Sequence, residues 1–107
     1  MSAGERFFKA LQQAHAVHGT EKLAETMHSS FEWTSLTKTS MASQVHSRTE
    51  ALEVFNVSRN VTEEIVFADD DVLIFSGFGD LGAWLTFCKF EGGKAVDMRH
   101  ARGQRPD

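Results

Sequence analysis

The fold of this chain is decided by residues 61–101, VTEEIVFADDDVLIFSGFGDLGAWLTFCKFEGGKAVDMRHA, in which apolar runs alternate with short turns. The turns are the Asp triplet at 69–71, a Gly-Asp-Leu-Gly segment at 79–82 and Gly92-Gly93. The runs between them predict strands over 61–68, 72–78, 83–91 and 94–101. Consecutive strands joined by such short turns pair antiparallel, so the stretch predicts a meander.

The middle strands of this meander are apolar on both faces. Ile74 alternates with Leu73 and Phe75, and Trp84 alternates with Leu85. An antiparallel sheet with one face in water would show a cleaner alternation of apolar and polar residues. We therefore expect helices on one face of the sheet and a second copy of the chain, in a homodimer, on part of the other.

The residues before position 61 predict three helices and one short strand. Apolar residues recur at helical spacing over 4–18, and Thr20 can cap a second helix that continues to about His28. β-forming residues predict a strand over 31–39, followed by a Ser/Thr-rich loop through residue 46. Ser47 and Glu50 have the spacing of a capping box, which starts a third helix over 48–58.

Length and composition limit the functional classes. The 107 residues predict a single domain spanning 1–107, in which 102–107 form a short polar tail. A net charge of −4 without a basic stripe argues against a nucleic-acid partner. No run of about 18 apolar residues and no signal-peptide pattern is present, so we expect no membrane partner and a cytoplasmic location. The single cysteine, Cys88, lies among aromatic residues and is expected to be buried and unreactive.

Four segments resemble, in order and spacing, the nuclear transport factor 2-like superfamily and within it the SnoaL-like proteins. They are FEWTSL (31–36), SRTEALEVF (47–55), ADDDVLIFSG (68–77) and FEGGKAVDMRH (90–100). The resemblance implies an α+β, cone-shaped fold, with three N-terminal helices packed on a strongly curved, mainly antiparallel sheet and a pocket at the open end. Members include epoxide hydrolases, ketosteroid isomerases, polyketide cyclases and binding modules, so the fold leaves the function open.

The catalytic residues of these enzymes are only partly matched. The position of the isomerase base is occupied here by Ser35, and the chain contains no tyrosine to stabilise an enolate. The W-R-D motif of the last strand corresponds to Met98, Arg99 and His100, so a histidine stands where the hydrolases and cyclases place an aspartate. A histidine can give or take a proton near neutral pH, which makes His100 the candidate catalytic residue. The alternative is a half-buried histidine that forms hydrogen bonds and does no chemistry.

Strand alternation separates the other candidates. Val96, Met98 and His100 share one face of the last strand, which we expect to point into the cone, while Ala95, Asp97 and Arg99 share the other. The predicted ligand-binding residues are Trp33, His28, Trp84 and Met98, and the predicted ligand is small, neutral and largely apolar.

The histidines lack the close spacing of metal ligands, so we expect no metal and no cofactor. A second hypothesis makes the chain a non-catalytic homodimeric module. In that hypothesis the outer sheet face is the working surface, with the predicted interface residues Leu85, Phe87, Asp97 and Arg99.

Overall fold

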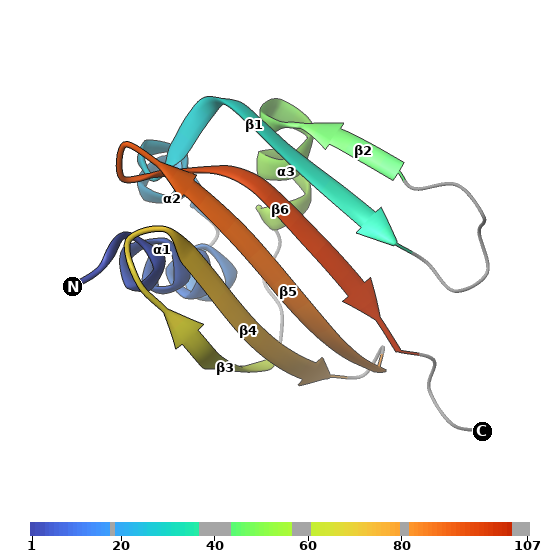
Figure 1. Ribbon diagram of the computed structural model, residues 1–107. Coiled ribbons are helices and arrows are strands. Elements are labelled where there is room, and N and C mark those ends of the chain that lie inside the picture. The colour runs from blue at the N-terminus through green and yellow to red at the C-terminus, as the bar shows by residue number, and fades with distance from the viewer. Residues whose placement is uncertain (18, 37–43, 57–60, 80–81, 104–107) are drawn as a thin grey trace.

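The computed structural model describes residues 1–17, 19–36, 44–56, 61–79 and 82–103. Its helices are α1 (Ala3–Val17), α2 (Glu21–Glu25) and α3 (Arg48–Phe55). Its strands are β1 (Met27–Leu36), β2 (Gln44–Ser47), β3 (Thr62–Ala68), β4 (Val72–Gly79), β5 (Gly82–Glu91) and β6 (Lys94–Arg102). The strands form one six-stranded sheet in the order β2-β1-β6-β5-β4-β3 (Figure 1).

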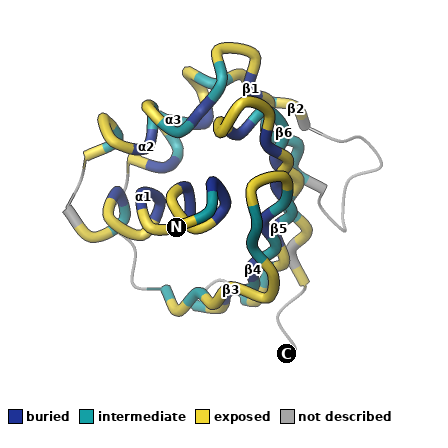
Figure 2. The backbone as a smooth tube through the Cα atoms, turned by 60° about the vertical axis from the view of Figure 1, so that its left-hand side comes forward, coloured by how far each residue is buried: buried dark blue, intermediate teal, exposed yellow. Residues whose placement is uncertain are grey.

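The helices all cover one face of this curved sheet, which confirms the predicted α+β class (Figure 2). Helix α1 contacts strands β3 to β6, and α3 contacts β1 and β2. Two aromatic side chains of α1 fix this packing: the Phe7 ring meets Phe90 with centroids 5.8 Å apart, and Phe8 meets Phe75 at 5.3 Å, both edge to face. Such pairs add to the stabilisation that burial of the rings provides.

Strands β3 to β6 form the predicted antiparallel meander, and β1 joins it by running parallel to β6. The register shifts within the β1–β6, β3–β4 and β5–β6 pairs. Such bulges bend a sheet and increase its twist, which explains how six strands curve around the helices.

Two predicted boundaries in the N-terminal half are wrong. Helix α2 ends at Glu25, and Met27 and His28 already belong to β1. The cause is pairing with a distant strand: Met27 lies opposite Ala95, whose N–H donates to the Thr26 carbonyl at 2.8 Å. Residues 44–46, predicted as loop, form β2 because they pair with β1, while 37–43 lie outside the described residues.

The predicted alternation of the last strand fails at one position. Ala95, expected on the outer face, is fully buried, as is Met98 on the inner face. Lys89 lies opposite Asp97 whereas Phe90 lies opposite Ala95, so Val96 is an extra residue on β6. This bulge brings Ala95 to the inner face and leaves the alternation of the following residues unchanged.

Capping boxes start two of the helices. The predicted box of α3 is present: the Ser47 hydroxyl accepts from the Glu50 N–H, and the Glu50 carboxylate accepts from the Ser47 N–H at 3.0 Å. Ser2 and Glu5 exchange the same two bonds at the start of α1. The hydrogen bonds from Ser47 lower the pKa of Glu50.

Candidate functional site

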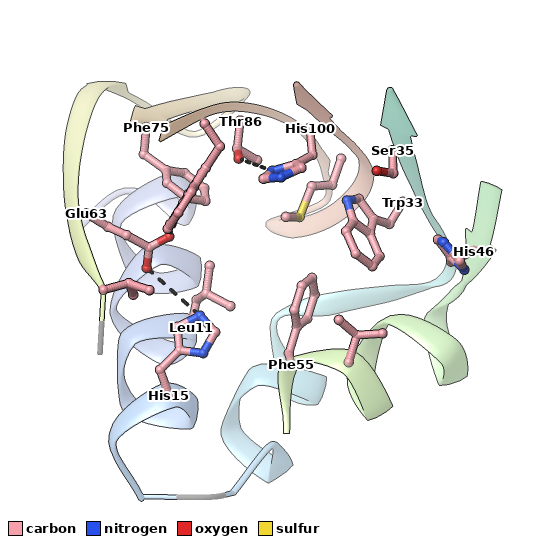
Figure 3. Close-up of a pocket in the computed structure, with 14 residues that line it drawn as sticks. Leu11, His15, Trp33, Ser35, His46, Phe55, Glu63, Phe75, Thr86 and His100 are labelled. Atoms are coloured by element: carbon pink, nitrogen blue, oxygen red, sulfur yellow. Dashed lines mark hydrogen bonds and ion pairs between the residues drawn. The ribbon is translucent and has the colours of Figure 1, made fainter. Parts of the chain in front are cut away.

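A cavity of about 310 Å³ lies between the inner face of the sheet and helices α1 and α3 (Figure 3). That volume is at the small end of the range for ligand pockets. The residues that line it are Leu11, His15, Trp33, Ser35, His46, Val54, Phe55, Val61, Glu63, Phe75, Trp84, Thr86, Met98 and His100.

Strand register explains why these residues meet. One row across the inner face runs from Phe75 through Thr86 and His100 to Ser35, each opposite the next on the neighbouring strand. A second row places Met98 opposite Trp33, and Trp33 opposite His46. The pocket is therefore built on neighbouring paired strands of the sheet.

His100 shares a hydrogen bond with a buried hydroxyl. Its Nδ1 lies 3.0 Å from Oγ1 of Thr86, which is 1% exposed. According to its tautomer, the imidazole Nδ1 either donates a hydrogen bond to the threonine oxygen or accepts one from the threonine O–H. In both cases the bond fixes the plane of the ring at the pocket wall.

Trp33 is surrounded by rings. Its indole centroid lies 5.0 Å from His46, 5.4 Å from Phe55 and 6.2 Å from His100. The Trp33 Nε1 atom is buried, and among the described residues it has no hydrogen-bond partner. A buried N–H without an acceptor is costly, so the pocket offers a donor that a ligand oxygen can satisfy.

The wall formed by α1 and β3 carries a carboxylate that the sequence analysis did not select. The side chain of Glu63 is only 6% exposed, and its Oε1 lies 3.9 Å from Nε2 of His15. The Trp84 indole N–H donates to Glu63 Oε2 at 3.3 Å. Figure 3 shows Glu63 and His15 facing one another across the pocket from Trp33 and His46.

A signal for this pair exists in the sequence. In the predicted strand over 61–68, Glu63 shares a face with Val61 and Ile65, and His15 follows Leu11 by four residues on the apolar stripe of the first helix. Charged residues on a face that should be buried are themselves an indication of a site.

Four of the five residues predicted to bind or act on a ligand line this one cavity: Trp33, Trp84, Met98 and His100. His28 does not line it. Since it lies near the start of β1, before the register shift, its Nδ1 instead accepts the backbone N–H of Ser30 at 3.0 Å.

The predicted interface residues lie on the outer face of the sheet. Leu85 is 52% exposed, and Phe87 is partly buried. The Arg99 Nε atom lies 3.4 Å from an Asp97 carboxylate oxygen on the same face. Exposed pairs of this kind contribute little to stability.

Among the described residues, no group of three or more His, Cys, Asp or Glu side chains could hold a metal ion. Cys88 is fully buried, and burial raises the pKa of its thiol far above the ordinary value. The reactive thiolate is therefore suppressed in the folded chain. Of the described helices, none combines the length and the apolar character needed to cross a bilayer.

No protein-family model matches the sequence, and comparison with curated proteins found no significant relative. Solved structures do match. An NTF2-like protein of unknown function from Shewanella baltica superposes with a TM-score of 0.73 at 10% identity, over 98% of this chain and 93% of that one. Another NTF2-like protein of unknown function, from Methylobacillus flagellatus, superposes with a TM-score of 0.72 at 10% identity, over 94% of this chain and 90% of that one.

A ketosteroid isomerase-like protein from Erwinia carotovora gives a TM-score of 0.57 at 12% identity, over 96% of this chain and 92% of that one. The chain therefore has the nuclear transport factor 2-like fold, as the sequence motifs predicted. Its class is an α+β protein whose curved sheet and helices enclose a pocket. At these identities the likeness shows the fold alone.

Proposed function

We propose that this protein binds a small, largely apolar molecule with a carbonyl or hydroxyl oxygen in the pocket beneath α1 and α3. The observation that carries the proposal is the buried Trp33 N–H, which has no acceptor among the described residues and stands in a wall of aromatic rings. Apolar walls with a few placed polar groups are typical of small-molecule sites.

We infer that His100 is the proton-transfer group of this pocket. Its ring is fixed by Thr86, and it shares the cavity with Trp33, the donor for a substrate oxygen. A positioned imidazole contributes about 10²–10⁴-fold to a rate by proton transfer. A substrate carbonyl, hydroxyl or epoxide would be the group on which it acts.

The test is a thermal-shift screen with steroids, terpenes, epoxides and aromatic ketones. A ligand at about 100 times its Kd adds roughly 2.7 kcal/mol of stability, a rise in Tm of about 10 °C for a chain of this size. The chain has two tryptophans and no tyrosine, and both tryptophans line the pocket, so quenching of fluorescence confirms a hit.

Two variants locate the bound compound. Trp33→Phe keeps an aromatic ring but removes the N–H, and should weaken binding of an oxygen-bearing hit by about 5-fold or more. His100→Ala should abolish any turnover of that hit and leave the fold intact. His28→Ala is the matched control, because this histidine lies outside the cavity. Equal losses in the control, or no hit from any compound class, would contradict the proposal.

A second proposal concerns the outer sheet face, where we propose that two copies of the chain meet. One row crosses all six strands there, from Phe67 through Ile74, Phe87, Arg99 and Thr34 to Val45. Phe67, Val45 and Leu85 are more than half exposed, and a shallow hollow lies among Ile74, Leu85 and Phe87. Apolar side chains gathered on an exposed face are typical of interaction sites.

We propose a second copy of this chain as the partner, because acidic and basic side chains both lie beside the apolar residues of this face. Asp97 and Lys89 lie opposite one another on β6 and β5, and Arg99 stands within the apolar row. A patch of mixed sign can match itself about a twofold axis. Sedimentation should show a dimer that Leu85→Glu dissociates, whereas Ala16→Glu, at an exposed position of α1, leaves it intact. A wild-type monomer at high concentration would refute this proposal.

A further inference from the structure

Among the described residues, Thr86 is the only polar or charged residue that the fold buries, with 1% of its surface exposed. It lies on β5, in the row of the inner sheet face between Phe75 on β4 and His100 on β6. A hydroxyl in this position has almost no contact with water. Its O–H therefore needs an acceptor from the protein, because an unpaired polar group is costly to bury.

The acceptor that the structure gives the Thr86 hydroxyl is the His100 ring. Within the described part of the chain, the one hydrogen bond of Thr86 Oγ1 joins it to His100 Nδ1 at 3.0 Å (Figure 3). A hydroxyl has one proton to donate, and an imidazole nitrogen that accepts it carries none. Satisfying the threonine O–H thus requires an unprotonated Nδ1, which in the neutral ring leaves the proton on Nε2.

The reversed hydrogen bond is less favourable. If Nδ1 of His100 carried the proton, it would donate to Thr86 Oγ1, and the threonine O–H would be left without an acceptor among the described residues. A buried donor that loses its acceptor disfavours such a state by about 10-fold or more. This preference concerns Nδ1 alone and holds whatever else the ring contacts.

We propose that Thr86 is a positioning residue, which holds neutral His100 as the tautomer with its proton on Nε2. The inference deepens the proposed function and rests on it, since it says in which chemical form His100 meets a ligand. In this tautomer Nε2 can only donate, so the neutral ring polarises a ligand oxygen and cannot take a proton through that atom. Trp33 Nε1, in the same cavity, also only donates. The favoured ligand oxygen is therefore an acceptor, as in a ketone or an epoxide.

Nitrogen NMR of the isotope-labelled, ligand-free protein tests the tautomer, because protonated and unprotonated ring nitrogens differ widely in chemical shift. The spectrum is recorded at about pH 8, above the ordinary pKa of histidine. The chain has five histidines, and the signals lost in His100→Gln are those of His100. We expect an unprotonated Nδ1 and a coupling across the hydrogen bond between Nδ1 and the Thr86 hydroxyl proton.

Substitutions of the threonine test its role. Thr86→Val removes the hydroxyl and keeps a β-branched side chain that suits a strand. The ratio of the Nε2–H tautomer to the Nδ1–H tautomer should fall by about 10-fold or more relative to the wild type. Thr86→Ser keeps the hydroxyl and should keep the wild-type ratio. Thr34→Val is the matched control, because Thr34 lies opposite Arg99 in the outer row, and it should leave the ratio unchanged.

The outcomes separate this inference from the proposed function. A wild-type ring with a proton on Nδ1, as the other tautomer or as the imidazolium, would overturn the role of Thr86, and so would an equal ratio in Thr86→Val. If Thr86→Val does not fold, the wild-type coupling decides: its presence supports the proposal and its absence contradicts it. No ligand enters these measurements. A screen without a hit would therefore refute the proposed function and leave the tautomer standing, whereas a protonated Nδ1 would leave ligand binding standing.

Discussion

Gly77 is the residue on which the α1–β3 end of the pocket depends. A Cβ atom at this position would lie 2.5–2.7 Å from three atoms of the Trp84 indole, which is closer than real Cβ contacts. Gly77→Ala must therefore displace the indole and break its bond to Glu63, and overpacking of this kind typically costs about 1–3 kcal/mol. We expect a shifted Trp84 emission spectrum.

The measurement uses Trp33→Phe as the background, so that Trp84 is the only emitter. Gly103→Ala is the control, because its added Cβ would meet its nearest atom at an ordinary 3.7 Å. An unchanged emission spectrum in Gly77→Ala would show that the indole does not rest on this glycine.

At the residue scale, the sequence predicted Trp33, Trp84, Met98 and His100 but selected neither Glu63 nor His15. Alternation along the last strand places Met98 and His100 on one face, which is a local pattern. The meeting of Glu63 with His15 depends on how α1 crosses the sheet, which no local spacing specifies.

The capping box of α3 gives a prediction at the scale of elements. The Ser47 backbone N–H, and then its hydroxyl, hold the pKa of Glu50 below its ordinary value of 4.5. Because the folded pKa is the lower one, ionised Glu50 stabilises the fold above pH 4.5, and this contribution is lost as the pH falls through the folded pKa. Glu50→Gln should therefore lower the free energy of unfolding at pH 7, and the difference should disappear in acid.

Urea unfolding at several pH values measures this difference. Glu53→Gln, on the exposed surface of the same helix, controls for the removal of one negative charge. A difference between wild type and Glu50→Gln that is constant from pH 7 to pH 3 would contradict the role given to the carboxylate.

Ser47→Ala should lower the free energy of unfolding by about 1 kcal/mol, the usual contribution of an N-cap hydroxyl.

The elements predicted best are those with local signals. Short turns fix the meander over β3 to β6, and the Ser47–Glu50 spacing fixes the start of α3. The errors lie where pairing between residues far apart in the sequence determines the secondary structure. Strand β2 forms because it pairs with β1, and α2 ends early because Met27 pairs with Ala95. Tertiary pairing of this kind overrides the local preference of the sequence.

At the scale of the whole molecule, apolar character on both faces of the meander predicted that both faces are used. The inner face meets the helices, as expected. The outer face keeps Leu85 and Phe67 about half exposed, which is the basis of the proposed dimer. The sequence pattern thus located the face that meets the helices, and the use of the outer face stays a prediction. The depth and polarity of the cavity required the packing of α1 and α3.

The rate at which a reagent labels the Cys88 thiol measures how often the core of the molecule opens. It is fully buried in the core, and burial raises the pKa of its thiol, so labelling by a thiol reagent requires the core to open. For an ordinary free energy of unfolding, labelling should be more than about 10³-fold slower than in urea-unfolded chain. A pocket ligand at about 100 times its Kd should slow it by a further factor of about 100, because opening of the core destroys the pocket.

The same measurement connects the fold to the site. Cys88 lies directly opposite Met98, which lines the cavity, so an opening that exposes the thiol also separates two pocket strands. Labelling of Trp33→Phe should be slowed less by an oxygen-bearing ligand, in proportion to its weaker binding. Labelling that is fast in the native state, or slow but insensitive to a ligand that quenches both tryptophans, would mean that β5 and β6 open without the pocket, and that the two are not one cooperative unit.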